Sequence, residues 1–207
     1  QNNAERHNSF LPSNYLKTLQ ILALCDTFDK TITMMQSLCR TETMNEESIH
    51  EKYMRMALKE AERASKSDEV PCGCVIIRTH PDNPGKTDLI AKAHNQVETL
   101  KDPTAHAEMI AITQAVSAVG DWRLTDTILY VTKEPCVMCA GAIVLARIPL
   151  VVFGCKDPQR GGVVSVFNIL NHPNLNHHCD IVPGILESDC RSILQSFFLG
   201  KREKRNT

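Results

Sequence analysis

The sequence has no excess of charge of either sign and no long hydrophobic run. Lys and Arg total 23 against 24 Asp and Glu, a formal net charge of −1, so nothing global marks a polyanion-binding protein and any nucleic-acid surface must be local. The longest apolar stretch near the N-terminus, Leu19–Cys25, is interrupted by Gln20 and stops at Asp26. It is too short for a membrane span and too polar at both ends for a signal-peptide core. We expect a soluble protein with no membrane partner.

Internal repeats and low-complexity segments are also absent, and no secretory signal is evident. The composition, 43% hydrophobic and 23% charged, excludes a fibrous or disordered chain and suits a globular domain with one core. The nine cysteines are an odd number in a chain that is not small, which disfavours a disulfide framework. We therefore expect a reducing compartment, the cytoplasm.

The first 44 residues differ from the rest of the chain. Their apolar residues follow a patchy helical rhythm without good caps, and a cleaner segment opens at Met44. We interpret residues 1–44 as an N-terminal extension of uncertain status and residues 45–207 as one domain. The extension is either a helical addition to that domain or a stretch upstream of the natural start.

Within residues 45–207, helix and strand signals alternate. Ser48 and Glu51 form a capping box ahead of an apolar stripe at helical spacing. Further helices are predicted at 103–119, 136–147, 164–170 and from 187 onward. Strands are predicted at 71–78, 88–94, 127–132, 150–155 and 179–182. Turn residues between the first two strands indicate a hairpin. This order predicts an α/β fold with a mixed five-stranded sheet sandwiched by helices.

Two short motifs supply a set of zinc ligands. Cys136 and Cys139 are three residues apart at a predicted helix start, so both can point to one side, and Pro135 suits that start because no N–H is needed there. His106 provides a third ligand. Three protein ligands leave one tetrahedral position for water, which is the catalytic arrangement rather than the structural one. We predict one Zn²⁺ per subunit.

Glu108 is predicted to be the catalytic residue. It follows His106 by two positions, which in mid-helix would send the two side chains to nearly opposite faces. The pattern therefore requires His106 at the helix start, as Pro103 just upstream favours. Zinc can make a nucleophile from water at neutral pH. An unligated Glu108 would take the water proton, pass it to a ring nitrogen and later protonate the departing amine, which is hydrolytic deamination.

Other interpretations of the same residues are weaker. A redox pair at Cys136 and Cys139 would require a preceding thioredoxin-like βαβ unit, and none is predicted. A structural zinc site would require a fourth protein ligand at close spacing, and the sequence offers none. Cys72 and Cys74 alternate on a strand and are expected to be small buried hydrophobes.

The pattern H-x-E…P-C-x-x-C is a signature of zinc-dependent deaminases. From about Ile49 to about Arg205 the sequence resembles the bacterial tRNA adenosine deaminases, which make inosine at the wobble position. The matching segments are 69–71, 93–95, 102–108, 129–132, 139–142, 151–154, 172–177, 184–186 and 197–198. The resemblance implies a cytidine-deaminase-like fold, a homodimer, and a tRNA anticodon stem-loop bound across it. By matching position, Asn95 contacts the flipped base and the Ala107 backbone lies against it.

The C-terminal segment is a candidate RNA contact. Lys201 and Arg202 belong to a basic helix end that can meet phosphates, and Phe198 can stack on a base; the alternatives are a solvated tail and a core aromatic. Lys133 departs from the family, which usually has an apolar residue before Glu-Pro-Cys.

Two other functions stay open at this stage. The chain could deaminate a free base such as guanine or cytosine, or it could be an inactive, zinc-stabilised RNA-binding subunit. The intact Glu108 argues against the inactive subunit.

Overall fold

A computed structural model of the protein describes residues 48–205. The described residues belong to one compact unit, and the extension expected at 1–44 lies outside them. None of the described helices is long and apolar enough to cross a membrane.

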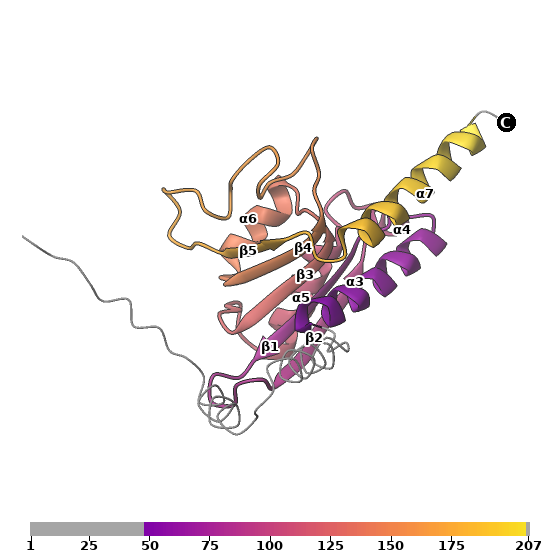
Figure 1. Ribbon diagram of the computed structural model, residues 1–207. Helices are drawn as coiled ribbons and strands as arrows, with labels where there is room; N and C mark the ends of the chain where they lie inside the picture. The colour runs from indigo at the N-terminus through magenta and orange to yellow at the C-terminus, as the bar shows by residue number, and fades with distance from the viewer. Residues whose placement is uncertain (1–47, 206–207) are drawn as a thin grey trace, which may run out of the picture. The chain divides into compact units, whose positions relative to one another are not determined.

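A single five-stranded sheet in the order β2-β1-β3-β4-β5 organises this unit (Figure 1). Its strands are β1 (Gly73–Thr79), β2 (Thr87–His94), β3 (Thr127–Lys133), β4 (Leu150–Cys155) and β5 (Asp180–Pro183). The helices are α3 (Ile49–Lys66), α4 (Val97–Leu100), α5 (Ala107–Val119), α6 (Val137–Leu145) and α7 (Glu187–Arg205). Strand β1 runs antiparallel to β2 and β3, whereas β3, β4 and β5 are parallel. The predicted mixed sheet is confirmed.

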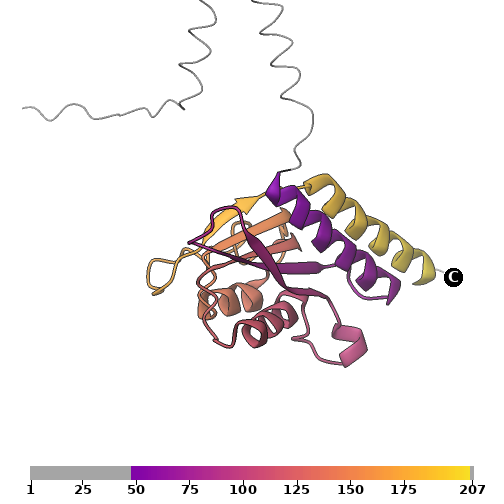
Figure 2. The same ribbon diagram turned by 90° about the horizontal axis from the view of Figure 1, so that it is seen from below.

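Helices cover both faces of the sheet (Figure 2). Helices α3 and α7 lie side by side on one face, and α5 and α6 cover the other. The alternation of side chains along a strand explains the two layers. In β3, Tyr130 belongs to the core under α3, while Leu129 and Val131 belong to the core under α5 and α6. Because both faces are buried, the central strands are apolar at nearly every position.

Most predicted elements are confirmed, with shifted ends. The Ser48 hydroxyl accepts the Glu51 N–H, as the capping box predicted. Helices α5 and α6 begin at Ala107 and Val137, later than predicted, because His106 and Cys136 are extended N-cap residues. The short helix α4 was not predicted.

The prediction of a helix at 164–170 is wrong. This segment is a series of turns. The backbone N–H groups of Val163, Val164 and Ser165 are all donated to the side-chain carboxylate of Glu134. The N–H groups of Val166 and Phe167 bond to the Gly161 carbonyl and that of Ile169 to the Gly162 carbonyl, five to seven residues back instead of four, so no helical hydrogen-bond pattern continues past the amides that Glu134 binds.

Candidate metal centre and substrate pocket

The starts of two helices hold the predicted zinc ligands. His106 is the N-cap of α5, and Cys136 is the N-cap of α6 with Cys139 in its first turn. The expectation that His106 lies at a helix start is confirmed. Both helices direct their positive ends toward this point, which favours thiolate over thiol at the two cysteines.

The three side chains are close enough to share one metal ion. Their ligand atoms all lie within 4.8 Å of one another. His106 Nδ1 is 3.6 Å from Cys136 Sγ and 3.5 Å from Cys139 Sγ, and the two sulfurs are 3.7 Å apart. A tetrahedral ion with Zn–S of about 2.3 Å and Zn–N of about 2.0 Å would place its ligand atoms about 3.5–3.8 Å apart. The residues present therefore fit zinc.

Charge is unevenly shared between the two thiols. Hydrogen bonds from Cys139 and from His106 outweigh burial and lower the pKa of Cys136 to about 3. The same hydrogen bond to Cys136, together with burial, raises the pKa of the Cys139 thiol. The site thus already stabilises one thiolate next to the His106 ring, whose pKa the bond to Cys136 raises.

Glu108 lies in the first turn of α5 and is 3% exposed. Among buried side-chain oxygen and nitrogen atoms in the described part of the chain, its Oε2 alone has no hydrogen-bond partner. Burial raises the pKa of this carboxyl. An unpartnered buried carboxylate oxygen costs free energy unless a ligand or water uses it. Its place beside the metal ligands fits the predicted role in proton transfer.

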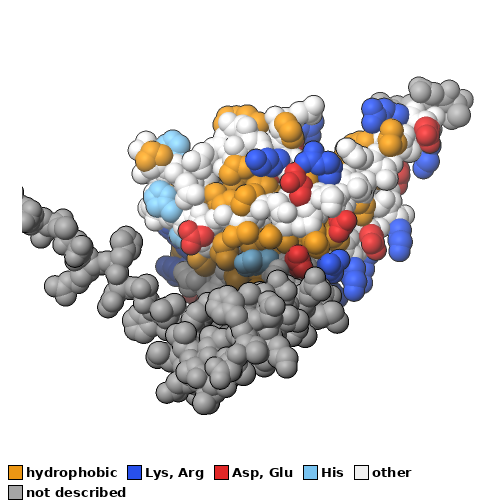
Figure 3. Space-filling view, viewed as in Figure 1, with side chains coloured by type: hydrophobic (Ala, Val, Ile, Leu, Met, Phe, Trp, Pro, Cys, Tyr) orange, Lys and Arg blue, Asp and Glu red, His pale blue; other side chains and the backbone are white. Residues whose placement is uncertain are grey.

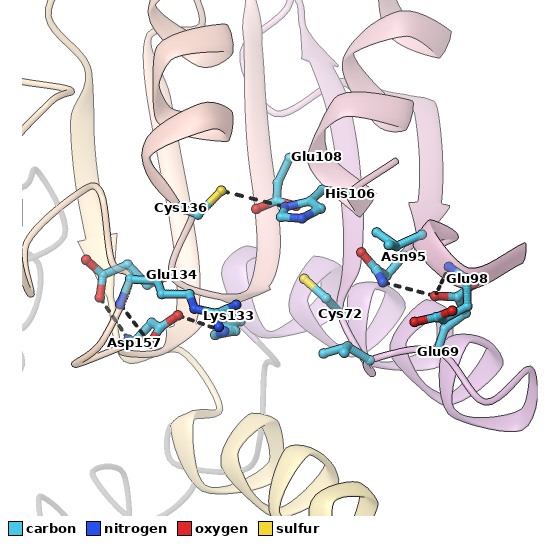
Figure 4. A pocket seen from close by; sticks show the side chains of 13 residues that line it. Glu69, Cys72, Asn95, Glu98, His106, Glu108, Lys133, Glu134, Cys136 and Asp157 are labelled. Atoms are coloured by element: carbon cyan, nitrogen blue, oxygen red, sulfur yellow. Dashed lines mark hydrogen bonds and ion pairs between the residues drawn. The ribbon is translucent and has the colours of Figure 1, made fainter. Parts of the chain in front are cut away.

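The metal centre opens into a pocket of about 240 Å³ (Figure 4). His106, Glu108 and Cys136 lie between its two walls. One wall carries Glu69, Asn95 and Glu98, and the other carries Lys133, Glu134 and Asp157. The volume is below the roughly 300–1,000 Å³ of pockets for drug-sized ligands. A single nucleobase is the appropriate size of ligand.

Asn95 is held in one orientation by Glu69. The Asn95 Nδ2 donates to Glu69 Oε2 at 3.2 Å, and the carboxylate also accepts the backbone N–H groups of Glu98 and Thr99. Burial opposes ionisation of Glu69, but the bonds from Thr99, Glu98 and Asn95 outweigh it and lower its pKa. Because one amide N–H is committed to Glu69, the amide plane of Asn95 is set before any ligand arrives.

Glu134 organises the opposite wall, two residues before Cys136. Its carboxylate accepts N–H groups from Asp157, Val163, Val164 and Ser165 and the Ser165 hydroxyl. Burial raises the pKa of Glu134, but these hydrogen bonds outweigh it and lower the pKa. The bond from the Ser165 hydroxyl lowers it most. A Cβ at Gly161 would overlap the Glu134 carboxylate, which explains a glycine there. The loop after β4 is therefore anchored beside the metal ligands.

Lys133 lies in the pocket, as its place in the sequence suggested. Its Nζ is 2.7 Å from Asp157 Oδ2, and the two side chains are 30% and 9% exposed. Burial opposes ionisation of Asp157, but the hydrogen bond and charge of Lys133 outweigh it and lower the Asp157 pKa. Glu69, Glu134, Asp157 and Arg160 also line the pocket and were not identified from the sequence as site residues.

The remaining predicted residues occupy different places. Ala107 is the buried first residue of α5, directly after the metal ligand. Phe198 and Lys201 line a second hollow, about 520 Å³, which shares Val70 and Glu98 with the first pocket. Arg202 is exposed on α7 and donates to the Phe198 carbonyl; it lines neither hollow. The structure thus brings Phe198 and Lys201, but not Arg202, next to the pocket.

Comparison with known proteins identifies the family. The family model for the cytidine and deoxycytidylate deaminase zinc-binding region matches residues 47–155. The chain belongs to this deaminase family. Within the family, it is 44% identical over 153 residues to the tRNA-specific adenosine deaminase of Streptococcus pyogenes serotype M1, covering 74% of this chain and 85% of that protein. The sequence resemblance is confirmed.

Solved structures agree with this family assignment. A structure from a study of A-to-I editing by tRNA:A34 deaminases at the wobble position is 40% identical, with a TM-score of 0.63, and covers 69% of this chain and 99% of that one. The guanine deaminase of Nitrosomonas europaea matches with a TM-score of 0.60 at 20% identity, covering 71% of this chain and 83% of that one. The second likeness shows the shared fold alone.

Proposed function

We propose that this deaminase converts adenosine to inosine in tRNA, at the wobble position of the anticodon stem-loop. One observation carries the chemistry: Glu108, buried with an unpartnered oxygen, lies beside a ligand set that fits zinc, at the inner end of a base-sized pocket. The choice of substrate is supported by the 44% identity to tRNA-specific adenosine deaminases and by the likeness to a wobble-editing structure.

Proton transfer is the work of Glu108. His106, Cys136 and Cys139 would hold the zinc, which when bound supplies a Lewis acid that makes hydrolysis possible at neutral pH. Glu108 accepts the proton of the attacking water at its unpartnered oxygen and delivers it to a ring nitrogen of adenine. Glu108 then takes the remaining proton of that water oxygen, now bound to the ring carbon, and passes it to the amino group, which leaves as ammonia as the carbonyl of hypoxanthine forms. Water is consumed, ammonia is released, and the base becomes hypoxanthine.

Base recognition falls to the wall that carries Asn95. We propose that the Asn95 amide, set in plane by Glu69, hydrogen-bonds the edge of the flipped base, while the Ala107 backbone packs against it. Enzymes that modify a nucleobase generally flip it out of the base stack into the active-site pocket, because the target atom cannot be reached within the stack. The pocket volume of about 240 Å³ has room for one such base.

The RNA strand outside the pocket would bind at the second hollow, which Phe198 and Lys201 line. Phe197 and Phe198 stack edge to face, and Lys201 lies 5.3 Å from the Phe197 ring. Figure 3 shows further Lys and Arg side chains on the projecting part of α7. Aromatic faces and phosphate-binding cations are what single-stranded RNA sites combine. We propose that Phe198, Lys201 and Arg202 contact the strand beside the flipped base.

We further propose a homodimer with one zinc per subunit. Exposed apolar side chains lie on α6 and on the loop after β4, namely Val137, Leu145, Val164, Val166 and Phe167. Such a group on a protein surface marks a contact site. We place the protein in the cytoplasm, where the seven described cysteines, all free, stay reduced. We propose residues 45–207 as the deaminase domain and residues 1–44 as an extension outside it.

The test of this function is to incubate the zinc-loaded protein with unmodified tRNA, quantify inosine after digestion of one portion to nucleosides, and locate it by reverse transcription and sequencing of another. Parallel reactions with free guanine, cytosine and adenine measure ammonia release. Inosine at the wobble position without release from free bases is the expected result. Ammonia from a free base alone would establish the free-base deaminase, and RNA binding without any deamination would establish the inactive subunit.

A further inference from the structure

We propose that Lys133 is a specificity-determining residue whose ammonium, held in place by Asp157, binds a phosphate oxygen of the RNA strand beside the base in the pocket. The inference rests on the proposed function and concerns why a base within a strand is preferred to a free base.

The backbone places the ammonium in the pocket wall. Lys133 is the last residue of β3, and Asp157 follows the end of β4 by two residues. These strands are parallel and pair through Lys133 and Cys155, so both side chains emerge at the same carboxyl edge of the sheet, where ligands of α/β proteins bind. Asp157 Oδ1 in turn accepts the N–H groups of Gln159 and Arg160. A long side chain is thus held in one position before the ligand binds.

Most of the hydrogen-bonding capacity of Lys133 is unused. An ammonium has three N–H donors. Within residues 48–205 its one partner is Asp157, and the side chain, 30% exposed, lines the pocket. Two donors therefore remain for a ligand. In Figure 4 the Lys133 head lies between Asp157 and the middle of the pocket.

The surrounding charges indicate what kind of ligand those donors would take. Five carboxylates and only two basic side chains, Lys133 and Arg160, line the pocket; the carboxylates are those of Glu69, Glu98, Glu108, Glu134 and Asp157. An RNA strand that enters beside these carboxylates is attracted by the positive charges of Lys133 and Arg160. A neutral free base gains little from an ammonium, whereas a phosphate oxygen forms a strong charge-assisted hydrogen bond.

A purely structural role for Lys133 is the competing explanation. Asp157 is buried, so removing Lys133 leaves an uncompensated charge, which by itself destabilises a fold. A Lys133→Met variant alone therefore cannot separate the two roles. The double variant Lys133→Met with Asp157→Asn can, because it removes the ammonium without leaving a buried charge behind.

The experiment compares full-length, zinc-loaded protein with three variants: Lys133→Met, the double variant, and Lys86→Met. Lys86 is an exposed lysine in the turn between β1 and β2, at the end of β1 that lies about 20 Å from its pocket end. Its replacement removes the same charge far from the pocket. An unmodified anticodon stem-loop RNA is the probe, with inosine formation giving kcat and KM, and equilibrium binding measured from low to high salt.

Both variants that lack Lys133 are expected to raise KM about tenfold, the effect of losing one charge-assisted hydrogen bond. Their salt dependence of binding should be shallower by about 0.7 in log–log slope, and Lys86→Met should keep both values. A double variant with the KM and slope of the unaltered protein would overturn the inference and leave Lys133 as the counter-ion of Asp157. If the unaltered protein bound the RNA but made no inosine, the proposed function would fail, and the binding slopes would still decide the role of Lys133.

Discussion

At the scale of single residues, the contrast between Glu108 and its neighbouring carboxylates is the informative one. Glu134 accepts bonds at both oxygens from a loop, and Glu69 does so from α4 and Asn95. Glu108 has an oxygen without a partner. Carboxylates that are saturated by amides hold structure, whereas one that is left unsatisfied in a pocket is available for chemistry.

Replacing Glu108 with Gln tests that assignment. The amide keeps the shape but cannot accept and return a proton, so inosine formation should fall by a factor of about 10²–10⁴. Zinc content, measured by elemental analysis, should stay at one per chain because Glu108 is not a ligand. As the control, Cys136→Ala should lose the metal and lower the melting temperature, since metal binding is linked to folding. Loss of zinc from Glu108→Gln would contradict the division of roles.

The ligand set and the place of Glu108 were predicted from two short motifs together with their match to the deaminase signature, and the structure does bring His106, Cys136 and Cys139 together. These motifs could not predict Glu69 or Glu134. Their partners lie between 23 and 31 residues away in sequence, and nothing in the local pattern distinguishes such a glutamate from a surface one. Lys133 was noticed only as a departure from the family pattern. Its partner Asp157 could be identified only in the structure, where the pairing of β3 with β4 brings the two side chains together.

At the scale of elements, the site is built from the ends of helices and strands. The periodicity of apolar residues predicted these elements well where packing follows the pattern, as in α3 and β3. It failed at 164–170, where backbone N–H groups bond to the Glu134 carboxylate and to carbonyls five to seven residues back rather than four. The short α4 was missed because four residues are too few to show a period, and its first turn is held by the Glu69 carboxylate.

Glu69→Gln tests this support of α4. All three bonds to Glu69 require an acceptor, and a Gln amide nitrogen cannot accept, so at least one N–H is left without a partner. The free energy of unfolding should fall by about 1–3 kcal/mol. The folded-state pKa is lowered, so the contribution is present above the unfolded value of about 4.3 and is lost as pH falls through the folded value. Chemical denaturation at pH 7 and at pH 3 should show the difference between the two proteins shrinking in acid, and a difference that grew would refute it.

The C-terminal helix permits an independent test. Changing Lys201, Arg202 and Lys204 to Ala should weaken binding of tRNA and reduce its salt dependence, by up to about 0.7 in log–log slope for each phosphate that is no longer neutralised. The rate of inosine formation with saturating enzyme should change far less, since side chains that bind phosphates position the RNA. Filter binding across a range of salt concentrations measures the first effect. Unchanged affinity and slope would show α7 to be a solvated helix end.

At the scale of the whole molecule, the exposed apolar group on α6 and the loop after β4 is the surface to test for self-association. Phe167 is 52% exposed. Phe167→Glu should shift the protein from dimer toward monomer in sedimentation velocity. Leu89→Glu, at an exposed leucine of β2 outside this group, is the matched control and should leave the mass unchanged. A dimer that persists in Phe167→Glu would place the subunit contact elsewhere, and a monomeric unaltered protein would refute the proposed dimer.

The loop that Glu134 anchors has two ends with different neighbours. One end, at Asp157 and Arg160, forms a wall of the pocket, and the other carries Phe167 on the surface. A ligand that tightens the wall and a partner that covers the surface act on the same short piece of chain. Where both favour one arrangement of this loop over another, thermodynamic linkage requires that each changes the affinity for the other by the same factor. Two pockets connected through such loops would not be independent, and occupancy of one would alter the affinity of the second.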